Sequence, residues 1–515
     1  MPNSFETAAY ESRSLHEQNE RFKAMSALEN ALKQSPDNDA LRADRNNMRL
    51  ALLRTRAGTD PTKEMQLKLK KLHDHSKWEA LNEACSLLLK IHPDSVFVLD
   101  MLGVAKRELG EFDFAATLHT KALQINPDYA PAYQNCGMLM MELGYFTQAA
   151  EFFNKAIVFD ETAYEAYTGL GACLWFTGLR KESQEFYEAA ERHSHGLTRI
   201  KALANLGGVA LLKKNFAEGW ALRENRLVAI NEQARSPANL QKKRWAGQHV
   251  SHLLLWAEQG IGDEVMFASC FHELTQFADK ITVTANDKLL PLFRRSFPDK
   301  FHFISRNNDL KDIEFDAQVP VMTALAAVRQ TESDFGKAKI AYLQPDKKRV
   351  REVSQKIRFL ADNRPIIGLS WSSKAKPFGK HRSIPLVDLV DSLPKESFLV
   401  NLQYGEVEAE IIQVFNATGR KVHSVADIDN WQDVDGLAAL IAACDRVVSI
   451  DNAVVHLAGS IGKVCDVMLP VSADWRWADG GTADSYWYTS LNLHWQKNVG
   501  DWRHCLDSLA GTFSN

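Results

Sequence analysis

The sequence predicts a helical-repeat region followed by two parallel-sheet α/β domains. In the N-terminal half, small residues recur every 34 positions, which indicates stacked pairs of helices. From about Ser251, short apolar runs alternate with helical stretches, and this pattern restarts at 364–371. Such alternation is typical of strand–helix–strand units. The expected domains are residues 1–230, 231–345 and 346–515.

Composition excludes several classes of protein. The chain has 515 residues, of which 45 % are hydrophobic and 24 % charged, as in ordinary globular proteins. The net charge of −4 gives no argument for a nucleic-acid partner. No run approaches the roughly 18 apolar residues of a membrane span. The seven cysteines contain no C-x-x-C pair, which favours a reducing compartment and argues against a structural zinc. We therefore expect a cytoplasmic protein without a membrane span.

The repeats are marked by small residues at fixed positions: Gly103, Gly137 and Gly171; Gly110, Gly144 and Gly178; and Ala122, Ala156 and Ala190. Between them the sequence reads as two amphipathic helices per repeat, with Gly at the turn. This pattern resembles the tetratricopeptide repeat. The repeats extend over about 60–194, with a weaker copy at 60–93. A divergent helical pair precedes Pro36, and a last copy at 203–227 caps the array.

A stack of such repeats forms a superhelix with a concave groove. One interpretation is a groove for an extended peptide or protein, which the architecture favours. The other is a scaffold for dimerisation or packing. The sequence leaves the oligomeric state open.

The first loop of interest, 258–264, follows the first expected strand. Gly260 and Gly262 allow a tight turn and a close approach to a ligand. Asp263 is either the N-cap of the next helix or a general base at the mouth of a cleft between the two α/β domains. Ligands bind beyond the carboxyl ends of strands in such sheets.

A second loop follows the expected strand 446–450. Asp451 ends this strand, and a helix starts near Ala453, so its first amides and dipole favour a phosphate. Asn452 lies at this turn, and His456 in the first helical turn adds a donor to a diphosphate. Alternatively, Asp451 caps the helix and His456 packs beneath a neighbouring loop.

A third loop, at 370–386, is rich in hydroxyl and basic side chains. Ser370, Lys374 and Arg382 are its candidate phosphate contacts, and Arg382 is preferred because it precedes the next helix. An ordinary solvated loop is the alternative for this run of charge.

Several segments together resemble the heptosyltransferase-type glycosyltransferases of family nine, and more closely a bacterial group in which tetratricopeptide repeats are fused to such a domain. They are "LLLWAEQGIGDEVMFAS", "HRSIPL", "LQYGE", "DGLAALIAACDRVVSIDNAVVHLAGSIGKVCDVMLP" and "DWRWADGG…DSYWY". The plan is also similar to that of the protein O-linked N-acetylglucosamine transferases. The resemblance implies a GT-B fold, a nucleotide-sugar donor held mainly by the C-terminal domain, and no required metal or other cofactor.

The resemblance also implies roles for individual residues. Asp263 would be the catalytic base, and Arg382 would contact donor phosphate. The D-T-G-x-x-H motif of the family falls on Asp451, Asn452, Ala453 and His456, where Asn452–Ala453 replaces Thr–Gly.

Two further patterns have alternative interpretations. Trp475 and Trp477 lie in an aromatic cluster that follows the last strand expected from the pattern. One interpretation is that they stack on a base or sugar, and the other is that they belong to the core. Asp427 and Asp429 form a D-x-D pattern that elsewhere holds a metal, but here we expect it to cap or flank a loop.

The leading hypothesis is a glycosyltransferase that moves a sugar from a nucleotide-sugar to a Ser/Thr hydroxyl of a protein recruited by the repeats. Flagellin or another surface protein is the candidate acceptor. One alternative is a transferase with a lipid or polysaccharide acceptor. The other is a non-catalytic repeat scaffold with a degenerate GT-B domain, which only the Asn452–Ala453 replacement favours.

Overall fold

The computed structural model describes residues 42–44, 47, 60–229, 243–310, 313–336, 341–375, 378–478 and 482–513. The chain separates into two compact units, Met1–Gly169 and Leu170–Asn515. The division falls inside helix α9 (Tyr164–Phe176). The third clear repeat is therefore shared between the units.

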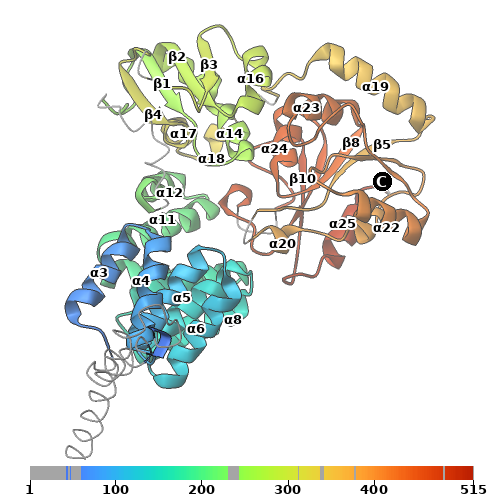
Figure 1. Cartoon of the computed structure of the whole chain (residues 1–515). Helices are drawn as coiled ribbons and strands as arrows, with labels where there is room; N and C mark the ends of the chain where they lie inside the picture. The colour runs from blue at the N-terminus through green and yellow to red at the C-terminus, as the bar shows by residue number, and fades with distance from the viewer. Residues whose placement is uncertain are drawn as a thin grey trace, which may run out of the picture. The chain divides into compact units, whose positions relative to one another are not determined.

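The first unit consists of paired helices (Figure 1). They are α3 (Lys63–Asp74), α4 (Trp78–Ile91), α5 (Val96–Glu108), α6 (Phe112–Ile125), α7 (Ala130–Glu142), α8 (Phe146–Phe159) and the first part of α9. The expected helical-repeat architecture is confirmed, and the weaker copy at 60–93 forms the pair α3–α4. The divergent pair expected before Pro36 lies outside the described residues.

Close helix packing explains the spacing of the glycines. A Cβ on Gly137 would lie 2.8 Å from the ring of Phe153, and one on Gly103 would lie 2.5 Å from the ring of His119. Each of these glycines therefore admits a ring from the second helix of its own repeat. The turn glycines have a different reason, because Gly110 and Gly144 adopt φ of +80° and +81°, which disfavours a side chain.

The second unit begins with helices that continue the repeats, α10 (Arg180–His193), α11 (Gly196–Leu212), α12 (Phe216–Arg223) and α13 (Arg226–Ala229). The expected capping copy corresponds to α11 and α12. Its apolar face is not left open, since α12 packs on α17 (Val321–Val328) of the first α/β domain. Trp220 Nε1 also donates a hydrogen bond of 2.5 Å to the carbonyl of Arg329.

A buried ion pair joins this helical segment to the α/β fold. Arg226 donates two hydrogen bonds, of 2.8 and 2.7 Å, to the carboxylate of Glu258 directly after the first strand. Both side chains are almost fully buried, at 1 % and 0 % exposure. Glu258 also accepts from the Met322 N–H at 3.0 Å. The loop after the first strand is thus fixed from the side of the repeats.

The first α/β domain (250–335) has a parallel four-stranded sheet in the order β3-β2-β1-β4. Its strands are β1 (Val250–Trp256), β2 (Ala278–Ala285), β3 (Phe301–Ser305) and β4 (Ala317–Pro320). Its helices are α14 (Ile261–Phe267), η2 (Ala268–Cys270), α15 (Phe271–Leu274), η3 (Thr275–Phe277), η4 (Asp287–Leu289), α16 (Leu290–Ser296), α17 (Val321–Val328) and α18 (Glu332–Phe335). Leu253 in the middle of β1 faces Ile281 and Ala317 on its two neighbours. The apolar run of β1 is buried as a central parallel strand requires.

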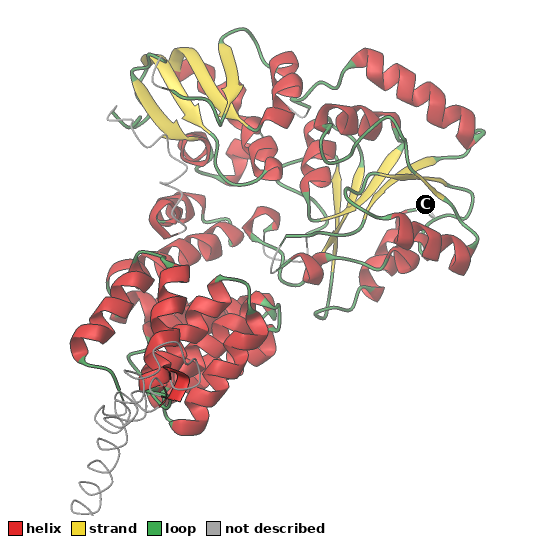
Figure 2. Ribbon diagram, in the orientation of Figure 1, coloured by secondary structure: helices red, strands yellow, loops and turns green. Residues whose placement is uncertain are grey.

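The second α/β domain (347–513) has a parallel six-stranded sheet in the order β10-β9-β8-β5-β6-β7. Its strands are β5 (Ile366–Ser370), β6 (Phe398–Asn401), β7 (Val422–His423), β8 (Arg446–Ile450), β9 (Cys465–Leu469) and β10 (Leu491–Trp495). Its helices are α19 (Lys347–Ala361), α20 (Gly379–Arg382), α21 (Leu386–Asp391), α22 (Glu408–Thr418), α23 (Val434–Ala443), α24 (Ala453–Ser460), η5 (Trp475–Trp477) and α25 (Arg503–Thr512). Figure 2 shows the two sheets of this unit as separate, each flanked by helices.

Two details refine the sequence-based expectation. The last strand of the sheet is β10, which pairs with β9, so the aromatic cluster precedes the last strand instead of following it. The charged segment between the two α/β domains forms α19, which packs on α23, and Arg349 donates to Asp433 at 2.9 Å. The fold class is confirmed, whereas the expected limits of the three domains stay predictions.

Among the described residues, no helix has the length and apolar character needed to cross a membrane.

Replacing Arg226 by Ala should lower the free energy of unfolding by about 3–5 kcal/mol, because Glu258 is then buried without its cation. Chemical denaturation of the whole chain measures this. The matched control is Arg199→Ala, which removes an ion pair whose arginine side chain is 51 % exposed, and it should cost about 0–1 kcal/mol. Equal losses in the two variants would contradict a structural role for the buried pair.

Candidate functional site

Asp263 is the third residue of α14, at the carboxyl end of β1. One carboxylate oxygen, Oδ2, accepts a hydrogen bond of 3.1 Å from the Gly260 N–H. The N-cap of α14 is therefore Gly260, and the alternative interpretation of Asp263 as N-cap is wrong by three positions. The carboxylate is placed in the first turn instead, where the helix dipole favours an anion.

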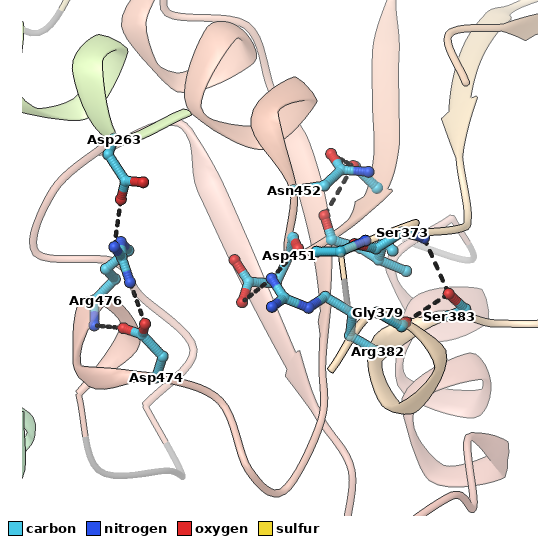
Figure 3. A network of polar contacts seen from close by, with 12 residues as sticks. Asp263, Ser373, Gly379, Arg382, Ser383, Asp451, Asn452, Asp474 and Arg476 are labelled. Atoms are coloured by element: carbon cyan, nitrogen blue, oxygen red, sulfur yellow. Dashed lines mark hydrogen bonds and ion pairs between the residues drawn. The ribbon is translucent and has the colours of Figure 1, made fainter. Parts of the chain in front are cut away.

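The other oxygen of Asp263 forms an ion pair with Arg476, which belongs to η5 in the second α/β domain (Figure 3). The guanidinium of Arg476 also pairs with Asp474 and donates to Gln259 Oε1 at 3.2 Å. Burial lowers the pKa of Arg476, but the carboxylates of Asp263, Asp474 and Asp451 outweigh burial and raise the pKa above its ordinary value. Arg476 is thus a permanent cation between two carboxylates.

Gly262 lies where the two α/β domains come closest in this region. A Cβ there would lie 3.0 Å from the ring of His456 and 3.4 Å from the backbone of Ala453. These distances are tight for a side chain, and α14 packs directly on α24. The glycine predicted to approach a ligand therefore also allows the two helices to touch.

His456 is buried, as the packing alternative expected. Its Nδ1 lies 3.1 Å from the Tyr488 hydroxyl, and its ring stacks on Trp477 at 5.6 Å between centroids. Burial lowers the pKa of His456 to about 4, against a smaller opposing effect of Asp451. The imidazole is neutral at pH 7, so it offers a diphosphate at most a neutral N–H donor.

Arg382 and Asp451 come together at the carboxyl ends of β5 and β8. Arg382 Nη1 donates to the Asp451 carbonyl at 3.1 Å and lies 3.5 Å from its Oδ2 (Figure 3). The preferred cation of the third loop therefore meets the acid of the second loop. Arg382 is therefore not a free cation but is paired with Asp451.

Asn452 is the N-cap of α24, since its Oδ1 accepts from the Val454 N–H at 3.0 Å. Its amide group also donates to Ser370 Oγ at 2.8 Å, on the neighbouring strand β5. The interpretation of Asp451 as the cap is therefore wrong by one residue. Asn is among the best N-cap residues, which gives a physical reason for Asn–Ala in place of Thr–Gly.

Ser370 is fully buried and its hydroxyl is committed on both sides. It accepts from Asn452 and donates to Gln403 Oε1 at 2.9 Å. The same oxygen of Gln403 accepts from the backbone N–H groups of Trp371 and Ser372, at 3.1 and 3.0 Å. This arrangement favours a role for Ser370 in holding the strand ends together rather than a direct contact with donor.

Lys374 lies on the exposed part of the third loop, which follows β5. Its side chain reaches the segment that follows β6. Its side chain passes over Gly405, where a Cβ would lie 2.6 Å from Nζ. Its backbone N–H donates to the Tyr404 hydroxyl at 3.4 Å. Lys374 and Arg382 therefore belong to the same loop but lie at the ends of different strands.

Trp475 and Trp477 are buried, at 4 % and 1 % exposure. Trp475 packs edge-on against Trp220, and Trp477 covers His456. Because so little ring surface is exposed, this packing favours the core alternative over stacking on a base or sugar. The D-x-D pattern is also structural, since Asp427 pairs with Lys356 and Asp429 accepts from the backbone of Trp431 and Gln432.

Sequence reasoning missed three residues of the site. Arg476 was signalled only as a charged residue between two tryptophans. Gln403 lies in the segment "LQYGE" without any pattern that predicts its three hydrogen bonds. Gln259 adopts φ of +65°, a local conformation that sequence does not reveal. Within the described residues, no group of three or more His, Cys, Asp or Glu side chains is placed to hold a metal ion.

Comparisons with known proteins add to this picture. The family model described as tetratricopeptide repeat matches residues 130–161. Protein FlbA of Caulobacter vibrioides is 29 % identical over 324 residues, which cover 59 % of this chain and 53 % of that protein. The chain thus spans about half the length of this curated relative. The match to the tetratricopeptide-repeat model covers helices α7 and α8, inside the expected repeat region.

Solved structures similar to this chain include two glycosyltransferases. One is the E. coli ADP-heptose lipopolysaccharide heptosyltransferase II, 14 % identical, with a TM-score of 0.38, covering 51 % of this chain and 100 % of that one. Another is a glycosyltransferase of family nine from Veillonella parvula, 11 % identical, with a TM-score of 0.37, covering 49 % and 87 %.

Next to Asp263, Glu264 points into the first α/β domain. Its carboxylate accepts from the Asn286 N–H at 2.8 Å and from Arg306 at 3.1 Å, at the carboxyl ends of β2 and β3. Burial raises the pKa of Glu264 to about 7, and these two donors only partly oppose the effect. The two adjacent carboxyl groups therefore have different surroundings. Asp263 pairs with Arg476 at the site, whereas Glu264 is buried inside the first α/β domain.

This raised pKa predicts a pH-dependent stability. Between the ordinary pKa of 4.5 and about 7, the folded chain keeps a proton that the unfolded chain loses, so Glu264 destabilises the fold as pH rises. Glu264→Gln should therefore gain stability over the native chain on going from pH 5 to pH 8, by up to about 3 kcal/mol.

Denaturation at both pH values measures this difference, with Glu185→Gln on an exposed helical position as the control. A gain for Glu264→Gln that is larger at pH 5 than at pH 8 would contradict the prediction.

Proposed function

We propose that the chain is a glycosyltransferase that moves a sugar from a nucleotide-sugar to a hydroxyl group of a protein bound by the tetratricopeptide repeats. The observation that carries this proposal is the ion pair between Asp263, from the first α/β domain, and Arg476, from the second. Asp451, the partner of Arg382, also acts electrostatically on Arg476. A sugar transfer needs both a base and cationic groups. The sequence resemblance to family-nine glycosyltransferases supports the same assignment.

Asp263 is the proposed general base. In the transfer it takes the proton from the acceptor hydroxyl as the oxygen attacks the anomeric carbon, and the bond from that carbon to the nucleoside diphosphate breaks. Such a base contributes about 10²–10⁴-fold to rate. Its side chain is 20 % exposed, so a hydroxyl group can reach it.

The second α/β domain is the proposed donor side. Arg382 and the N-terminus of α24 would stabilise the charge that develops on the leaving diphosphate. His456 would contribute a neutral N–H, because its pKa is lowered to about 4 by burial. Lys374 is the more exposed cation of the same loop and would contact the donor from the solvent side. No metal or other cofactor has a role in this proposal.

The repeats supply the proposed acceptor site. Repeat superhelices of this type bind extended segments of protein in their concave groove, and flagellin or another surface protein is the acceptor we favour. Cytoplasmic location is part of the same proposal, because nucleotide-sugars are made there.

The second candidate is a non-catalytic scaffold. The observation that favours it is the ion pair between Arg382 and Asp451, which already neutralises the preferred phosphate contact. In a domain that never binds a nucleotide, this ion pair would stay intact.

A thermal-shift panel with ADP, UDP, GDP, CMP and their common sugar conjugates separates the two candidates. A ligand present at about 100 times its Kd stabilises the fold by roughly 2.7 kcal/mol. We expect one base to raise Tm and Arg382→Ala to reduce that shift. If folded protein responds to no nucleotide, the scaffold is favoured instead.

Asp263→Asn should abolish turnover of the donor identified in that panel and leave its thermal shift nearly unchanged, because the amide cannot accept the proton. Release of nucleoside diphosphate measures turnover. Without the acceptor, the assay measures the slow transfer of the sugar to water. Unchanged release in this variant would remove Asp263 from the mechanism.

A further inference from the structure

We propose that Arg476 is the positioning residue for Asp263, holding the base of the first α/β domain in place from the second. This inference rests on the proposed function, since it concerns the same site. It assigns a role to a residue that the motif for phosphate binding does not include.

Arg476 contacts the loop of Asp263 at two points. Its Nη2 pairs with Asp263 (Figure 3). The same nitrogen donates to Gln259 Oε1 at 3.2 Å, at the start of the same loop. Gln259 is held with φ of +65°, so the loop has a bent, defined shape at this contact. Arg476 therefore holds both the carboxylate of Asp263 and the Gln259 side chain at the start of the same loop.

Arg476 is itself held by its neighbours. Asp474 pairs with its guanidinium and accepts from its backbone N–H at 3.0 Å. The buried rings of Trp475 and Trp477 anchor the turn on both sides, and the guanidinium lies 4.7 Å from the Trp475 ring centroid. The two tryptophans thus hold the turn that carries Arg476, and they do not offer an exposed ring for stacking.

The turn also contains a strained residue. Ala478, directly after Trp477, adopts φ of 61° and ψ of −178°, a region that residues other than Gly rarely occupy. Such a conformation persists only where the surroundings determine it, and it is frequent at functional sites. The turn around Arg476 is thus held in one shape despite this local cost.

Chemistry explains why the position needs an arginine. A proton acceptor must be aligned with the attacking oxygen, and misplacement by about 1 Å costs on the order of 10²-fold in rate. Arginine reaches Asp263, Gln259 and Asp474 simultaneously with its planar fork of donors, which a lysine ammonium cannot reproduce. Because Arg476 and Asp263 belong to different α/β domains, the base is aligned only while the two domains are in contact.

A second ion pair across the same two domains provides a matched control. Arg295 on α16 pairs with Asp435 on α23 and donates to the Gln344 carbonyl at 2.8 Å. Neither residue contacts the loop of Asp263 in these interactions. Arg295→Ala therefore weakens the contact between the domains without touching the base.

The first measurement is hydrogen–deuterium exchange of the 257–267 segment in the full chain. Arg476→Ala should exchange there on the order of tenfold faster than the native chain, and Arg295→Ala should not. Equal exchange in all three would overturn the positioning role, whatever the protein catalyses. Arg476→Lys, which keeps the charge, serves if the alanine variant does not fold, and it should give an intermediate rate.

The second measurement is turnover of the nucleotide-sugar that gives the largest thermal shift. Arg476→Ala should lower kcat about 10²-fold with KM nearly unchanged, and Arg476→Lys should recover part of that loss.

The two possible failures are distinguishable. If Asp263→Asn retains turnover, the proposed function of that residue fails, and exchange alone decides the positioning role. If Asp263→Asn is inactive while Arg476→Ala is as active as Arg295→Ala, the positioning role fails and the base assignment stands.

Discussion

The buried ion pair between Arg226 and Glu258 determines how the rest of the second unit is organised. It lies where the last helices of the repeat array meet the end of β1, and it leaves neither charge exposed. Since Glu258 begins the loop that carries Asp263, the helical segment fixes the starting point of the candidate site. A repeat that ends an array normally exposes a polar face, but here that face is built into the α/β fold.

From that fixed point the site is completed by the second α/β domain. The strand ends of both sheets carry the polar side chains, and opposite charges meet in pairs, Asp263 with Arg476 and Arg382 with Asp451. Each pair lowers the cost of enclosing its charges. Under the proposed function, a ligand with phosphates would therefore have to displace or share these existing partners.

Much of this was predictable from sequence. The 34-residue spacing predicted the repeats because a glycine is required wherever an aromatic ring from the paired helix takes the space of a Cβ. Strand ends could be placed because apolar runs stop at Glu258, Ser370 and Asp451. Arg476 could not be placed, since its partner is 213 positions away and its role depends on how two domains meet. Strand β10 was missed because the aromatic cluster before it reads as the end of the sheet.

The boundary inside α9 has a consequence for how this architecture can be cut. Because the units divide at Gly169 and Leu170 rather than after the repeats, a fragment starting at the expected limit of 231 would lose Arg226 and leave Glu258 enclosed without a counter-charge. A fragment that keeps the α/β fold intact therefore has to include the helices that precede β1, with Arg226 among them.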